Sequence, residues 1–316
     1  MKPIPPELTT GPFSRKDALA LGVTAQMLRG QRFVRMHPSV YRLASLELTD
    51  EHRLTAARLA LPDTAQLTGI SRIQVLGLDF GPRLPLHFVV EGDLHLALPG
   101  IFLHRTKQLA PLDDVGVCVE AAFISYCSLA RVIDAIKVGD WLLHSKHMDL
   151  SELIRIASMH LWRAGAYEAL YISNFLDADA RSLKESEAAA LIEFAGLPRP
   201  QLNIDLGLPG RTVIGDLVFR ELGVLLEYEG THHQEDRGQY NSDIERYKAV
   251  RDSRYRYLQL TKETVARPRR VVRAVHGELV AAGYDGPPPV FGDRWRVLFT
   301  RVSRIVGRRA PTADAA

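Results

Sequence analysis

Cysteine and long apolar runs are scarce in this chain, and their scarcity narrows the classes of protein it can belong to. Of 316 residues only Cys118 and Cys127 are cysteines, too few for a disulfide framework or a zinc module. We expect two buried or partly buried thiols in a reducing cytosol. No stretch approaches the roughly 18 apolar residues that a membrane-spanning helix needs, and the N-terminus lacks the apolar core of a signal peptide. The expected location is the cytoplasm, with no membrane partner.

A strong excess of either charge is also absent. The formal net charge is +3 at pH 7, so composition alone does not indicate a nucleic-acid-binding protein. The distribution is more informative, because residues 254–309 contain thirteen Lys and Arg but only four Asp and Glu. Such a basic segment often meets phosphates; a solvated surface is the alternative. The length and the 46% hydrophobic content indicate a globular protein of two or three domains.

The most informative pattern in the chain predicts a β-hairpin. Apolar and polar residues alternate over Asp216–Phe219 and again from Val224 onward, on either side of Arg220–Gly223. With these four residues as the loop, Phe219 pairs with Val224. Continuing this register pairs Val218 with Leu225, Leu217 with Leu226, and Asp216 with Glu227.

This register brings acidic side chains together. Asp216 stands opposite Glu227, and Glu229 shares a face with Glu227 because side chains alternate along a strand. Two carboxylates about 5 Å apart, at an effective dielectric of about 20, repel by roughly 3 kcal/mol. A cation would relieve this repulsion, and oxygen ligands of this kind suit Mg²⁺ or Mn²⁺. The alternative is a surface hairpin that carries solvated acids.

A series of motifs around the hairpin resembles a family of short bacterial domains related to the very-short-patch mismatch-repair endonucleases, within the PD-(D/E)XK nuclease superfamily. The resemblance covers about residues 181–282. Its motifs are Glu185-Ser186, Gly196–Pro200, Asp216-Leu217, Glu227–His233, Asp243–Arg246 and Tyr255–Thr261.

The resemblance implies a restriction-endonuclease-like αβββαβ core that hydrolyses phosphodiester bonds with a divalent metal. The implied metal ligands are Asp216, Glu227, Glu229 and Glu185. Glu229 departs from the pattern, because the related domains usually have Asp there and the superfamily motif has Lys. Either Glu229 is a third ligand, or another group must orient the attacking water and balance the charge of the transition state.

The candidates for that second role follow the acidic strand. Of His232 and His233 we favour His233 as the group that exchanges a proton with water or with the leaving oxygen. Gln239, Asp243 and Arg246 share one helical face; Arg246 could balance the phosphate charge, or pair with Asp243 for structure. Glu185 also has a structural alternative, since Ser182–Glu185 reads as a capping box.

The pattern of capping residues and strand-like segments over residues 10–43 predicts a winged helix. Ser14 and Thr24 are expected to cap two short helices that are separated by Gly22, and strands are expected at 32–36 and 40–43. The unit resembles the N-terminal domain of AbiEi-type antitoxins, whose wing motif is matched by Pro38–Tyr41. If the second helix enters a DNA groove, five residues could reach bases or phosphates; protein contact is the alternative. They are Gln26, Arg29, Gln31, Arg32 and Arg35.

The remaining segments are less specific. Helices are expected at 51–61, 65–76, 121–143 and 150–164, and strands at 87–91 and 101–105. This region resembles the middle part of long proteins with the same winged helix, through His104–Thr106 and Asp134; we expect Arg105 to pair with an acid for structure. Beyond Pro287–Pro289, apolar residues from 295 to 306 predict one basic amphipathic helix, followed by a disordered tail.

These patterns predict an α/β multi-domain protein with a winged helix-turn-helix at 1–50, a mixed α+β region at 51–180, a nuclease-like domain at 181–285, and the linker, helix and tail at 286–316. The expected function is that of an Mg²⁺-dependent endonuclease that acts on nucleic acid, with DNA favoured over RNA as the substrate. The first alternative is a DNA-binding regulator or antitoxin-like protein with an inactive nuclease fold. The second is an interaction module in defence or repair; whether a toxin or repair partner exists stays open.

Overall fold

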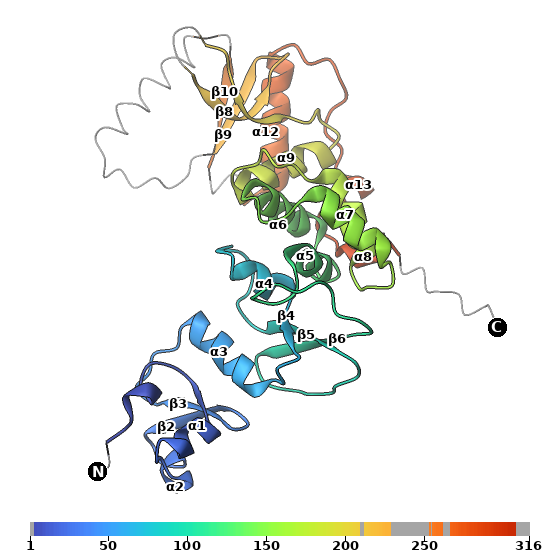
Figure 1. Ribbon diagram of the computed structural model, residues 1–316. Helices are drawn as coiled ribbons and strands as arrows, with labels where there is room; N and C mark the ends of the chain where they lie inside the picture. The colour runs from blue at the N-terminus through green and yellow to red at the C-terminus, as the bar shows by residue number, and fades with distance from the viewer. Residues whose placement is uncertain (1–2, 209–211, 229–252, 254, 262–265, 308–316) are drawn as a thin grey trace, which may run out of the picture. The chain divides into compact units, whose positions relative to one another are not determined.

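The computed structural model describes residues 3–208, 212–228, 253, 255–261 and 266–307 (Figure 1). Over these residues the chain is a mixed α/β protein with several small sheets and helices. It divides into two compact units, Met1–Tyr126 and Cys127–Ala316. Among the described residues, no helix is both long enough and apolar enough to span a bilayer. As expected, Cys118 and Cys127 are not joined in a disulfide; the first is half-buried and the second buried.

The first unit begins with a three-stranded sheet in the order β1-β3-β2. The side chain of Ser14 accepts a hydrogen bond from the Asp17 amide, and that of Thr24 accepts one from Met27, so both predicted helix caps are confirmed. Phe13 and other buried apolar side chains form a small core of their own. The elements are η1 (Pro6–Leu8), β1 (Phe13–Ser14), α1 (Arg15–Ala20), α2 (Ala25–Leu28), β2 (Phe33–His37) and β3 (Val40–Leu43).

The rest of the first unit comprises α3 (Asp50–Ala60), β4 (Gln66–Leu67), α4 (Gly69–Gln74), β5 (Leu86–Glu91) and β6 (Ile101–Thr106). The expected helix over 65–76 was wrong in its first turn. Gln66 and Leu67 pair with β5 instead, and α4 starts at Gly69, whose φ of 55° favours glycine. β5 and β6 run parallel.

The helices that follow are α5 (Val119–Cys127), α6 (Val132–His144), α7 (Leu150–Met159), α8 (Ala166–Ile172), the short η2 (Ser173–Phe175) and α9 (Leu183–Phe194). The helix expected over 121–143 is therefore two helices, broken at 128–131. The helix expected over 150–164 ends earlier, at Met159.

The prediction of a single C-terminal helix was also wrong. This helix is interrupted for the same physical reason as the break before α6. It consists of α13 (Asp293–Val297) and α14 (Val302–Ile305). Between them the chain bonds to the segment before α6: the Val132 amide donates to Thr300 O at 3.1 Å, and the Val302 amide donates to Ala130 O at 3.0 Å. These backbone groups satisfy each other, so neither helix continues. The predicted apolar face is nevertheless buried at Trp295, Leu298 and Val302.

A four-stranded sheet holds the predicted hairpin (Figure 1). Its order is β10-β9-β8-β7; β10 is parallel to β9, and the other neighbours are antiparallel. α9 contacts β8, while α12 contacts both β10 and α9. Residues 229–252 and 254 of the connection from β9 to β10, and the tail at 308–316, lie outside the described residues. The bounds are β7 (Gln201–Asp205), β8 (Ile214–Phe219), β9 (Val224–Tyr228), β10 (Arg256–Leu260) and α12 (Pro268–Ala281).

Candidate functional site

The β8–β9 hairpin has the predicted register over three of its four predicted pairs, from Phe219 with Val224 to Leu217 with Leu226. The fourth pair, Asp216 with Glu227, is not part of the ladder. The Asp216 carboxylate instead accepts a hydrogen bond from the Tyr228 amide, at 3.1 Å. A short acidic side chain competes in this way with backbone pairing at the point where the β8–β9 ladder ends. The two acids therefore remain on neighbouring strands, one of them held by a backbone amide.

Glu227 is buried, with only 6% of its surface exposed. It lies two residues from Leu225 and so shares a face with the small core that also contains Val218 and Tyr255. Burying an ionised carboxylate beside apolar side chains is costly unless charge or hydrogen bonds compensate for it. Such burial is unusual for an acidic residue whose only role is to keep the surface of a protein soluble.

Two further residues shape this site, and sequence reasoning missed both. Gln259 is the exposed partner of Glu227 in the parallel register of β10, and no periodicity reveals a register across a long connection. Gly215 precedes Asp216, and a Cβ there would lie 2.6 Å from Leu225 Cδ1 and 2.7 Å from Val218 Cγ2. Glycine thus allows the core to close directly beside the acidic residue.

Glu185, a predicted metal ligand, is buried at the start of α9. Its carboxylate accepts hydrogen bonds from the Ser182 hydroxyl at 2.8 Å, the Arg181 amide at 2.9 Å and Asn203 Nδ2 at 2.5 Å. The Ser182 hydroxyl oxygen also accepts from the Glu185 amide. This resembles the capping box expected as the alternative, except that the donating amide belongs to the residue before the cap. In the described part Glu185 thus joins α9 to β7.

The described residues contain no group of three or more His, Cys, Asp and Glu side chains that could together hold a metal. The remaining predicted members of the site lie outside the described residues. They are Glu229, His232, His233, Gln239, Asp243 and Arg246.

The residues predicted to contact DNA lie on α2, on the segment that leads from α2 to β2 and, for Arg35, on β2 itself. Most of them are exposed, while Arg32 is half-buried. Arg35 Nε donates to the His37 carbonyl at 3.3 Å, which holds this side chain along the wing. The exposed members are Gln26, Arg29, Gln31 and Arg35.

The expected pairing of Arg105 with an acid is confirmed, because its Nη1 lies 2.5 Å from Asp93 Oδ1. Asp134, the other residue of the middle region noted in the sequence, pairs with Arg131 at 2.6 Å. Neither pair requires a role in chemistry.

A second titratable cluster lies between β5 and β6. His87 Nδ1 and His104 Nε2 are 2.9 Å apart, and the ring of Phe102 packs against both imidazoles. Burial lowers the pKa of both histidines; together with the neighbouring His87 it lowers the pKa of His104 to about 4. Both imidazoles are therefore neutral near pH 7, one donating to the other.

The first unit is expected to lose stability as the pH falls from about 6.5 to about 4. In this window unfolded His104 binds a proton while folded His104 does not, which favours unfolding by up to about 3 kcal/mol. Thermal unfolding of the full chain across this range, beside His104→Gln, measures the effect. The variant keeps a hydrogen-bonding amide but does not titrate, so its curve should be flatter. Parallel curves would contradict this prediction.

A comparison of the sequence with protein-family models and with curated proteins finds no match.

Proposed function

We propose that this protein is a metal-dependent endonuclease that hydrolyses phosphodiester bonds of nucleic acid and is directed to DNA by an N-terminal winged helix. The observation that carries this proposal is the hairpin of the four-stranded sheet. It buries Glu227 on β9 and holds Asp216 on β8 by the Tyr228 amide. The alternative, a surface hairpin that carries solvated acids, does not account for an acid that is buried close to a second acid.

The order of elements supports the nuclease part of the proposal. Helix α9 is followed by the antiparallel strands β7, β8 and β9, then by the parallel strand β10 and helix α12. This is the order expected for an αβββαβ core, apart from the segment outside the described residues. In the first unit, two capped helices followed by the β2–β3 hairpin support the winged helix.

The donor set fits a hard divalent cation, because carboxylate oxygens are the ligands that Mg²⁺ and Mn²⁺ prefer. Asp216 and Glu227 would hold the ion, with Glu229 as a further ligand. Glu185 bonds to Arg181, Ser182 and Asn203 instead, and it does not group with the other two described acids. Such an ion polarises a phosphoryl oxygen and lowers the pKa of water. The Tyr228 amide orients the Asp216 carboxylate.

The other proposed roles rest on the sequence. His233 would move a proton between water and the leaving oxygen, and Arg246 would balance the phosphate charge. His232, Gln239 and Asp243 would support them.

One sequence feature favours a second function. Glu229 stands where the superfamily motif has Lys, and a nuclease fold without that positive charge could be inactive. The protein would then be a DNA-binding regulator or an antitoxin-like protein.

The test of the proposal is cleavage of supercoiled plasmid, linear duplex, single-stranded DNA and RNA with Mg²⁺, with Mn²⁺ or with EDTA. We expect cutting of at least one substrate with a metal and none with EDTA. A gel-shift assay in EDTA runs beside it. A folded protein that shifts duplex DNA but cuts nothing would favour the regulator. A protein that neither cuts nor shifts any substrate would overturn both functions.

A further inference from the structure

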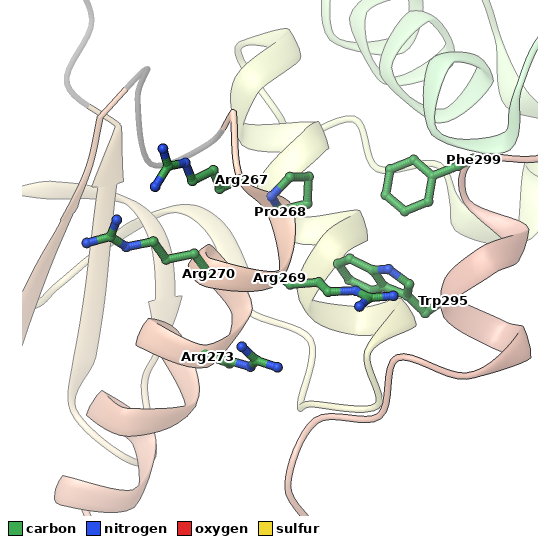
Figure 2. A pocket seen from close by; sticks show the side chains of 7 residues that line it. All are labelled: Arg267, Pro268, Arg269, Arg270, Arg273, Trp295 and Phe299. Carbon is green, nitrogen blue, oxygen red and sulfur yellow. The ribbon is translucent and has the colours of Figure 1, made fainter.

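Four arginines surround an open hollow of about 480 Å³ at the start of α12 (Figure 2). Figure 2 shows their side chains along the first turns of the helix, with two aromatic rings on the segment that begins with α13. The arginines are exposed, Trp295 is buried, and Phe299 keeps 37% of its surface exposed. The hollow is lined by Arg267, Pro268, Arg269, Arg270, Arg273, Trp295 and Phe299.

The charges are arranged against the usual preference of a helix. Acidic side chains stabilise the first turn and basic ones the last, because of the helix dipole. α12 has no acidic residue in its first turn and no basic residue in its last. Arg269 and Arg273 are also spaced i,i+4, and like charges at this spacing destabilise a helix. The free protein thus gathers positive charge where its own backbone disfavours it.

The cluster is not neutralised within the described part of the chain. None of its four arginines forms an ion pair with a described residue, whereas at least six other described arginines of this unit do. The guanidinium carbons of Arg269 and Arg273 each lie 5.5 Å from the ring centroid of Phe291, which positions them without removing their charge. Paired arginines in the same unit are Arg131, Arg155, Arg199, Arg256, Arg294 and Arg296.

We propose that the hollow at the start of α12 binds the phosphate backbone of a nucleic acid, with Arg267, Arg269, Arg270 and Arg273 on its phosphates. The planar guanidinium matches a phosphate with two parallel hydrogen bonds. Several such groups in an open hollow suit a chain of phosphates better than one small anion. The exposed ring of Phe299 adds a surface against which a base can stack.

This inference rests on the proposed function, since it assigns to the nuclease the surface that holds its substrate. The hollow and the hairpin site use different residues, so substrate binding can be measured without metal and without cleavage.

The test compares two double variants that remove the same charge from the second unit. Arg269→Gln with Arg273→Gln removes half of the cluster. Arg294→Gln with Arg296→Gln is the matched control, because both arginines are exposed and ion-paired. Binding of labelled duplex and single-stranded DNA and RNA is measured in EDTA between about 50 and 200 mM salt. Circular dichroism and melting temperature check the fold of each protein.

We expect the cluster variant to bind at least about 10-fold more weakly at about 100 mM salt, with a salt slope reduced by about 2. The control should stay within about 2-fold of the wild type. Equal losses in the two variants, or none in the cluster variant, would overturn the inference and leave the nuclease proposal standing. A wild type that binds no nucleic acid would overturn the proposed function itself.

Discussion

If the proposed metal site is right, Asp216→Asn and Glu227→Gln are each expected to lower metal-dependent cleavage by at least about 100-fold, because each would replace a charged ligand of the metal by a neutral side chain of the same shape. An asparagine in place of Asp216 would still offer an oxygen to the Tyr228 amide, so the hairpin should keep its register. The control is Glu221→Gln, the same chemical change on an exposed residue of the hairpin loop. Its activity should match that of the wild type.

Melting temperature separates loss of metal from loss of fold. In EDTA the two site variants should melt no lower than the wild type, because each removes one of two acids held on neighbouring strands. Mg²⁺ should raise the melting temperature of the wild type through binding to the folded state, and this shift should shrink in both variants. Undiminished cleavage by both variants would show that the metal site lies elsewhere.

The hairpin was predictable because its information is local. Alternation over Asp216–Phe219 and from Val224 sets the faces, and the loop between them sets the register; the structure has that register over three pairs. The departure at Asp216 arises because its side chain bonds to a backbone amide, a choice that periodicity does not encode.

Long-range contacts account for the features that the sequence did not predict. The segment after α13 bonds to the chain before α6, more than 160 residues away, and so divides two expected helices. Glu185 shows both cases, because its bonds to Arg181 and Ser182 follow from a local capping pattern, while its bond to Asn203 needs the packing of β7. Gln259 comes beside Glu227 only through a parallel pairing.

Asp140→Asn is expected to stabilise the second unit at pH 8 by up to about 4 kcal/mol. Asp140 lies on α6 and is 2% exposed. Burial raises the pKa of its carboxyl to about 7, and the nearby Asp177 adds to the rise. Hydrogen bonds from the Asp177 amide at 2.7 Å and from the Ser186 side chain, together with the charge of Arg199, lower it in part.

The sign of the pH dependence follows from proton binding. Unfolded aspartate releases its proton near pH 3.8, whereas folded Asp140 keeps it to about pH 7. Between these values the folded state binds the extra proton, so stability is highest below about pH 4 and falls as the pH rises to about 7. Above about pH 7 the folded state contains an ionised, buried Asp140, and its full energetic cost lowers the stability of the fold. Asp140 lines a cavity of about 10 Å³ together with Asp177, Ser186, Glu193 and Arg199.

Asparagine keeps the acceptor for the Asp177 amide and never carries this charge, so the variant should lack this fall in stability. Urea unfolding of the full chain at pH 5 and pH 8 measures the difference, with Asp179→Asn, an exposed residue nearby, as the control. Equal pH dependence in the wild type and Asp140→Asn would contradict the prediction. Asp140 on α6 bonds to Ser186 on α9, and α9 packs on β8. Ionisation of Asp140 therefore destabilises the contact between the two helices that support the acidic hairpin.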